Sequence, residues 1–131
     1  MPEPLVFIDV SEINPGKLED VKAGFSELAG FVEANEPRVI SYNVFFNADQ
    51  TVVTVVQVHP DSASMEFHMT AGAELFKKFA GLLTMRRMEI YGRPSAELLG
   101  SMRAKATMLG AGRVEIHELH AGVSRYSSAD R

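Results

Sequence analysis

Alternating and periodic apolar residues predict a strand, a helix and a hairpin in the first half of the chain. Residues 5–10 alternate around Asp9, which predicts a strand, because successive side chains of a strand point to opposite faces. From residue 17 to residue 35 the apolar positions recur every three or four residues, which predicts an amphipathic helix. Two runs rich in Val, Phe, Tyr and Thr follow at 38–47 and 51–59, and the short polar turn between them predicts an antiparallel hairpin.

The second half of the chain predicts shorter helices and two more strands. Pro60 ends the hairpin, and Asp61 or Ser62 can then cap a helix that carries His68. We expect that helix to break near Gly72. The remaining predicted elements are a helix over 73–83, a strand over 84–91, a helix over 95–109, a last strand over 113–119 and a frayed polar tail at 127–131.

The order of these elements predicts an α+β fold. It is β-α-β-β-α-β, the ferredoxin-like arrangement of an antiparallel sheet, followed by an extra helix and strand. Both faces of the hairpin strands are apolar, and we expect Val53 and Val55 on the face that the helices leave open. A half-solvated sheet is polar on one side, so this sheet needs a cover on both. The extra helix could supply some of it, but a homodimer through the sheet face is the simpler prediction.

Composition and charge narrow the class of protein. A chain of 131 residues, 46% hydrophobic and 23% charged, predicts one globular domain spanning 1–131. The net charge of -4 and the absence of Lys/Arg runs argue against nucleic acid as a partner. The sequence has no cysteine, no secretory signal and no apolar run that could span a membrane, so we expect a cytoplasmic protein without disulfides.

Several short motifs stand out together: the hairpin, the helix start Asp61-Ser62-Ala63, His68, Ile90-Tyr91-Gly92-Arg93-Pro94-Ser95 and Gly122-Val123-Ser124-Arg125. With these motifs the chain resembles the antibiotic biosynthesis monooxygenase (ABM) family. The resemblance covers about residues 4–126. It implies a dimeric α/β barrel built from ferredoxin-like units. It also implies a cofactor-independent monooxygenase for a small, largely apolar molecule of aromatic or polyketide-like character.

Two departures limit what the resemblance carries over. The chain has no tryptophan, on which the haem-degrading and quinone-forming branches of the family rely. The helix after His68 reads HMTAGAELF, so the second histidine of the family pattern His-x-x-Ser/Thr-Pro-His-Phe is missing. A haem role is disfavoured, no cofactor is expected, and the phenol-oxygenase constellation cannot be transferred whole.

His68 and Asn43 are the candidate catalytic residues. An imidazole titrates near neutrality, so His68 can remove a phenolic or enolic proton if it faces a pocket. Asn43 interrupts an apolar strand, and a buried amide needs a polar partner such as a ligand. The alternatives are a His68 that only hydrogen-bonds to the hairpin and an Asn43 that meets solvent or the dimer seam.

Candidate ligand-binding residues surround this pair. The proposed pocket walls are Tyr42, Phe46, Met65, Phe67 and Phe79. Either Arg86 or Arg87 could hold an anionic ligand, although pairing with Glu89 is the more usual role. No histidine pair has convincing ligand spacing, so we expect no metal. The alternative function is a non-catalytic module of the same fold that binds a small ligand or only dimerises.

Overall fold

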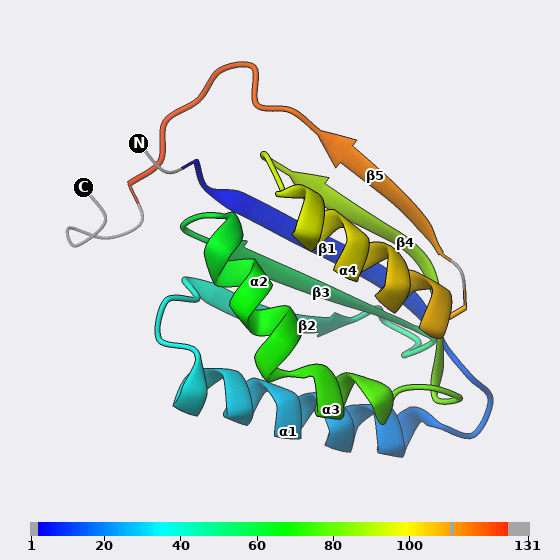
Figure 1. Ribbon diagram of the computed structural model, residues 1–131. Coiled ribbons are helices and arrows are strands. Elements are labelled where there is room, and N and C mark those ends of the chain that lie inside the picture. Colours follow the sequence, from blue (N-terminus) through cyan, green and yellow to red (C-terminus); the bar gives the residue numbers. More distant parts are fainter. Residues whose placement is uncertain (1–2, 111, 126–131) are drawn as a thin grey trace.

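The computed structural model describes residues 3–110 and 112–125, so the tail expected at 127–131 lies outside the described residues. The described chain forms an α+β fold, in which Figure 1 labels each helix and strand. In chain order these are β1 (Leu5–Ile13), α1 (Leu18–Asn35), β2 (Ser41–Phe46), β3 (Val52–His59), α2 (Ser62–Ala71), α3 (Ala73–Lys77), β4 (Leu83–Tyr91), α4 (Ala96–Met108) and β5 (Arg113–His117).

The sheet has the order β2-β3-β1-β4-β5. Its first four strands pair antiparallel, which confirms the ferredoxin-like arrangement. The extra helix α4 brings the chain back so that β5 joins β4 in parallel at the far edge. The sheet is not closed, and no helix among the described residues is long and apolar enough to cross a membrane.

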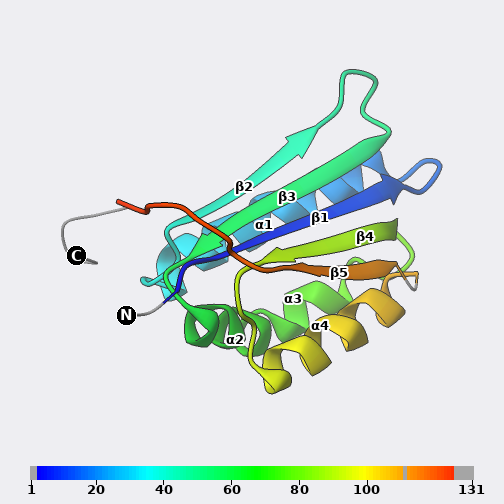
Figure 2. The same cartoon turned by 90° about the horizontal axis from the view of Figure 1, so that it is seen from above.

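The helices pack against one face of the sheet. Buried residues of α1, α2, α3 and α4 share a single apolar cluster with alternate residues of β1, β3 and β4. Figure 2 shows α2, α3 and α4 grouped on the same side of the strands. The extra helix α4 contributes Leu98, Met102 and Ala106 to this cluster, so it covers the same face as the other helices and not the opposite one.

The expected assignment of Val53 and Val55 to the open face is wrong. Both are buried in the cluster beneath the helices. Their neighbours Val52 and Val56 are only half-buried and point to the opposite face. The sequence predicted correctly that successive side chains of β3 alternate between the two faces. Alternation alone does not show on which face the helices pack.

We use "the open face" for the side of the sheet that no described helix covers. Cross-strand partners place Val6, Ile8, Val52, Val56 and Val58 there, together with Phe45, which is 54% exposed. Toward β5 the open face becomes charged, with Glu89 and Glu115 side by side. No described helix covers the apolar part of this face, and of the described chain only the segment after β5 lies beside it, at Val6 (Figure 2).

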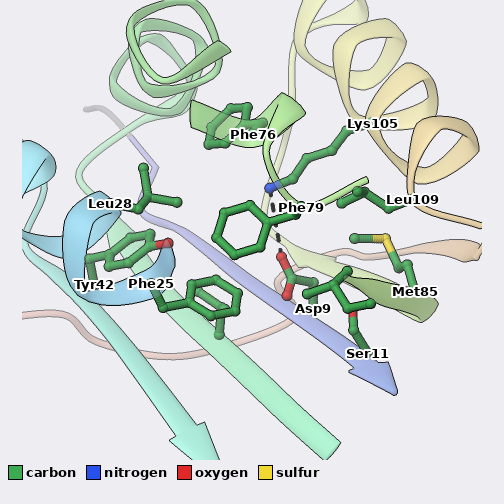
Figure 3. Close-up of a pocket in the computed structure, with 12 residues that line it drawn as sticks. Asp9, Ser11, Phe25, Leu28, Tyr42, Phe76, Phe79, Met85, Lys105 and Leu109 are labelled. Atoms are coloured by element: carbon green, nitrogen blue, oxygen red, sulfur yellow. Dashed lines mark ion pairs between the residues drawn. The ribbon is translucent and has the colours of Figure 1, made fainter. Parts of the chain in front are cut away.

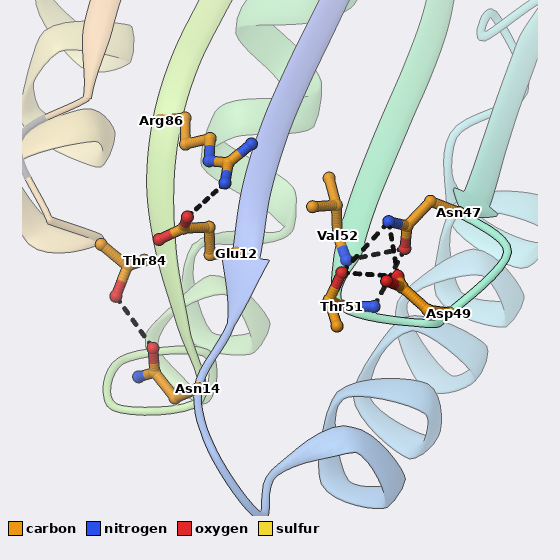
Figure 4. A network of polar contacts seen from close by, with 8 residues as sticks. All are labelled: Glu12, Asn14, Asn47, Asp49, Thr51, Val52, Thr84 and Arg86. Carbon is orange, nitrogen blue, oxygen red and sulfur yellow. Dashed lines mark hydrogen bonds and ion pairs between the residues drawn. The ribbon is translucent and has the colours of Figure 1, made fainter.

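Side chains near the strand ends fix the turns. In the β2–β3 turn the Asn47 side-chain oxygen accepts from the backbone N–H groups of Thr51 (2.9 Å) and Val52 (2.8 Å), and Asp49 accepts from Thr51 Oγ1 (Figure 4). At the start of α2 the Asp61 carboxylate accepts from Ser64 N–H, which confirms the predicted cap.

A bulge changes the direction of side chains in β4. The register between β1 and β4 shifts between Val10 and Ser11, so Met85 and Met88, three residues apart, are both buried. Arg86 and Arg87 form the bulge between Met85 and Met88. Arg86 pairs with Glu12 near the end of β1, as Figure 4 shows.

Candidate functional site

A small cavity lies between the helices and the sheet. Its volume is about 20 Å³, room for about one water molecule. Aromatic rings of Phe25, Phe76 and Phe79 form much of its wall. Figure 3 shows that Asp9 and Lys105 reach this space from β1 and α4, on opposite sides.

Asp9 and Lys105 form a buried ion pair at the cavity. Lys105 Nζ lies 3.8 Å from Asp9 Oδ2, and the two side chains are only 10% and 8% exposed. The ammonium also lies 4.3 Å from the ring centre of Phe76. Burial raises the pKa of Asp9 and lowers the pKa of Lys105, while the attraction between the two groups opposes both shifts. The separation is longer than a hydrogen bond, so neither charge is fully compensated by the other.

His68 and Glu36 form a second buried pair. His68 Nδ1 lies 2.7 Å from Glu36 Oε1, and both side chains are almost fully buried. Burial lowers the pKa of His68 and the hydrogen bond to Glu36 partly offsets that shift, so the imidazole is neutral at pH 7. A carboxylate only accepts, so Nδ1 carries the hydrogen and Nε2 keeps a free lone pair. Nε2 is buried with no hydrogen-bond partner among the described residues, so it can accept a proton, although His68 itself is not one of the residues that line the cavity.

Two aromatic rings connect the pairs. The ring centre of Phe76 lies 5.2 Å from that of His68, and the Lys105 ammonium lies over the same ring. The ring centre of Tyr42 lies 5.6 Å from that of His68, and Tyr42 also lines the cavity. Burial, followed by the charges of Asp9 and Glu36, raises the pKa of Tyr42, so its hydroxyl stays protonated and can donate.

Gly72 makes the position of the Phe76 ring attainable. A Cβ at residue 72 would lie 2.9 Å from Phe76 Cζ and 3.2 Å from the backbone oxygen of His68. The glycine that ends α2 therefore lets the ring pack close to the histidine.

Surface depressions lead to Glu36. One, of about 380 Å³, lies between α1 and β2 and is lined by Glu36 and Tyr42. Another, of about 280 Å³, lies beside α2 and is lined by Glu36, Ser64 and Phe67. Glu36 Oε2 is buried and makes no hydrogen bond within the described part of the chain. Both depressions therefore reach the partner of His68, and neither is lined by Asp9 or Lys105.

His59 lies next to His68 but has a different chemistry. Its Nε2 lies 2.9 Å from Gln57 Oε1, which accepts, and its Nδ1 lies 2.8 Å from Ser64 Oγ, which donates. Burial, with a smaller contribution from His68, lowers the pKa of His59 to about 3. Both ring nitrogens are satisfied in the neutral form, so His59 is a structural histidine.

The two buried histidines predict acid sensitivity. The pKa of His59 is about 3 in the fold and 6.5 in the unfolded chain, so only the unfolded chain takes up the proton between these values. The contribution of His59 to the free energy of unfolding is therefore full above pH 6.5 and falls below it, by about 1.4 kcal/mol per pH unit. The lowered pKa of His68 acts in the same direction.

Urea unfolding at a series of pH values measures this slope. We expect the pH dependence of the unfolding free energy to be weaker in His59→Gln by the contribution of one proton, about 1.4 kcal/mol per pH unit. His120 is exposed, and His120→Gln is the control that should keep the wild-type slope. Equal slopes in His59→Gln and the wild type would contradict the assignment.

The structure brings together only some of the residues that the sequence singled out. His68 and Tyr42 lie ring to ring, and Phe79 lines the cavity. Asn43 is exposed on the open face, where it pairs with Val56, so the sheet separates it from His68. Arg86 pairs with Glu12 at the sheet surface and does not line the cavity.

The other proposed wall residues lie apart from the cavity. Met65 is buried in the apolar cluster, and Phe46 packs against that cluster from the end of β2. Phe67 is 54% exposed and lines the depression beside α2.

Sequence reasoning missed Asp9, Glu36 and Lys105 as site residues. Two of them carried a signal: Asp9 interrupts the apolar side of a strand, and Lys105 occupies an apolar-face position of α4 between Met102 and Leu109. Glu36 stands before Pro37, where it could be read only as the end of a helix.

A group of possible metal ligands, which the sequence analysis did not anticipate, lies on the open face. Ligand atoms of Glu89, Glu115 and His117 all lie within 4.8 Å of one another. Arg87 and Arg113 pair with the two carboxylates at 3.5 Å and 3.2 Å. These arginines already compensate the negative charge that would attract a cation.

Solved structures of other proteins share this fold. No family model and no curated protein matches the sequence. The chain has the fold of the ABM proteins, which confirms the resemblance at the level of the fold. A protein from Bacteroides thetaiotaomicron assigned to the antibiotic biosynthesis monooxygenases is 19% identical, with a TM-score of 0.59 over 66% of this chain and 84% of its own.

Two further structures share the fold. SnoaB from Streptomyces nogalater, a cofactor-independent oxygenase, is 12% identical, with a TM-score of 0.61 over 72% of this chain and 96% of its own. MupZ from Pseudomonas fluorescens is 23% identical, with a TM-score of 0.71 over 93% of this chain and 94% of its own. The likeness to MupZ thus extends over nearly the whole chain.

Proposed function

We propose that this protein is an enzyme of the ABM fold, a cofactor-independent monooxygenase for a small, largely apolar molecule with a phenolic or enolic hydroxyl. The observation that carries the proposal is the His68–Glu36 pair: Glu36 fixes the proton on Nδ1 and leaves the buried Nε2 of His68 free to accept another. SnoaB, a cofactor-independent oxygenase with the same fold, supports the proposal of an oxygenase.

The chemistry needs only a base and a dry site. His68 Nε2 takes a proton from the substrate, and the resulting electron-rich anion passes electrons to dioxygen. A C–O bond forms at an activated CH₂ carbon, and the O–O bond then breaks. One oxygen atom stays on the carbon as a carbonyl, the other leaves as water with both hydrogens of the CH₂ group, and His68 is restored as a neutral base.

Other residues fit supporting roles in this proposal. The hydroxyl of Tyr42 orients the substrate oxygen, while Phe76 and Phe79 enclose its apolar part. The proposed dimer covers the open face with a second copy of the sheet, and the exposed Asn43 then becomes a polar contact of that seam. We propose the cytoplasm as its location.

Oxygen uptake tests the proposal. The protein is given anthrone, whose enol form is weakly acidic and whose CH₂ carbon is activated, under ¹⁸O₂. We expect one dioxygen consumed per anthraquinone formed and one labelled oxygen atom in the product. Uptake no faster than the protein-free reaction, for anthrone and for a panel of related hydroxyarenes, would contradict the oxygenase.

A non-catalytic ligand-binding module is the second candidate. One observation favours it: the cavity holds about 20 Å³, so a substrate enters only if the rings around it move. Native mass spectrometry of the freshly purified protein separates the two candidates. A retained small molecule together with no oxygen uptake supports the binding module.

A further inference from the structure

We infer that Asp9, Lys105 and Tyr42 form a subsite for the ionised oxygen of the substrate, so the protein takes acidic phenols or enols whose anion docks on Lys105. The inference rests on the proposed function in that the same cavity holds the substrate, but it uses residues other than the base. Figure 3 shows Asp9 and Lys105 facing each other from β1 and α4, with Tyr42 of β2 on the other side of the Phe79 ring in this view; all three residues line the cavity.

Among the residues that the structure describes, the ammonium of Lys105 lacks a full set of partners. It carries three hydrogens, yet its nearest charged neighbour is the Asp9 carboxylate at 3.8 Å and its other close neighbours are two aromatic rings. A buried ion pair with only a structural role is expected to close to hydrogen-bonding distance, about 2.7–2.9 Å, because charge that is left uncompensated in the interior is costly. The gap between Nζ and Oδ2 opens onto the cavity, where one oxygen atom fits.

Tyr42 adds a second donor to this end of the cavity. Its hydroxyl keeps its proton because the buried site and the nearby carboxylates disfavour the phenolate. A ligand oxygen can therefore accept from Lys105 and from Tyr42, while a ligand hydroxyl can donate to Asp9.

The surroundings select the class of ligand. The rings of Phe25, Phe76 and Phe79 favour an apolar, flat body next to the charged end. Phe25 and Phe79 pack with ring centres 4.5 Å apart. Phe79 lies on the turn after α3, so we expect its ring to be the one that moves when a ligand enters. An apolar ring with one weakly acidic hydroxyl satisfies both parts.

The two charged residues act in opposite directions on such a ligand. Lys105 stabilises the anion, whereas Asp9 repels the anion and accepts from the neutral hydroxyl. Removing Lys105 should therefore raise the pKa of a bound phenol, and removing the charge of Asp9 should lower it. If the ion pair only held α4 to the sheet, loss of either partner would shift the pKa of the bound phenol in the same direction.

4-Nitrophenol is the probe, because its phenolate absorbs visible light and its neutral form does not. We expect the wild type to bind it with a pKa about one unit below the free value, a tenfold gain in the anion. Lys105→Met should raise the bound pKa and weaken phenolate binding at least about tenfold. Asp9→Asn should lower the bound pKa further and tighten phenolate binding.

Controls separate this inference from folding and from the base. Lys78→Met removes an exposed lysine paired with Glu27 and should leave binding unchanged. Lys105→Gln keeps a donor without the charge and serves if Lys105→Met does not fold. His68→Gln should keep the 4-nitrophenol pattern, so a failed oxygenase with an intact pattern leaves the subsite standing. No binding by the wild type, or shifts of the same sign for Asp9→Asn and Lys105→Met, would overturn it.

Discussion

His68→Gln should lower the rate of oxygen uptake by about 10²–10⁴-fold, the usual contribution of a positioned base. Glutamine is close to histidine in size and can still donate to Glu36, but it has no basic nitrogen at the position of Nε2. Ligand affinity should stay within a few fold, because the anion subsite lies at Asp9 and Lys105. Steady-state oxygen uptake gives kcat and KM, and 4-nitrophenol titration gives the affinity.

The pH profile is a second readout of the same residue. His68 acts in its neutral form and burial lowers its pKa, so wild-type kcat should rise with pH below neutrality and be flat above it. Glu36→Gln should slow turnover as well, because the amide can donate to Nδ1 and so permits the tautomer with hydrogen on Nε2.

His59→Gln is the matched control. This histidine is as buried as His68, but both of its nitrogens are already bonded, so the folded variant should keep the wild-type kcat. Equal losses of kcat in the His59 and His68 variants would indicate that both histidines only contribute to packing. An unchanged kcat in His68→Gln would show that His68 is not the base.

Val56→Asp should convert the proposed dimer to a monomer. Val56 lies in the apolar part of the open face, and each dimer would bury the new carboxylate twice without a partner. An unpaired buried charge costs several kcal/mol, so the dissociation constant should rise by at least about 10³-fold. Light scattering after size-exclusion chromatography reports the mass at several concentrations.

Two substitutions bracket this result. Phe67→Asp places the same charge on an exposed apolar position of α2 and should leave the dimer intact. Val53 lies on the opposite face of β3, so Val53→Asp buries the charge beneath the helices and should unfold the chain. A Val56→Asp protein that remains a dimer would exclude the open face as the interface.

The element pattern was largely readable from the sequence because it depends on neighbours along the chain. Alternation in the hairpin and the three-to-four spacing in α1 report how a strand or a helix presents its side chains. Asp61 capped α2 as predicted, since capping joins groups three residues apart. The order of the first four strands followed from the order of the elements, because the ferredoxin-like arrangement fixes it, whereas the place of β5 beside β4 was not predicted.

The candidate site was only partly readable. His68 and Tyr42, both singled out from the sequence, lie next to each other in the interior, but Asn43, one residue from Tyr42, points to the other side of the sheet. The choice between the two faces depends on where the helices pack, as the misassigned Val53 and Val55 also show.

The sequence by itself determined the strands, the helices and their order, and it showed that both faces of the hairpin strands are apolar. Only the tertiary structure decided the chemistry of the interior. Glu36 meets His68 across 32 residues, and Asp9 of the first strand meets Lys105 of the last helix. Such pairings form when β1 takes the centre of the sheet and α4 packs over it, and burial then shifts the pKa values of the groups they enclose.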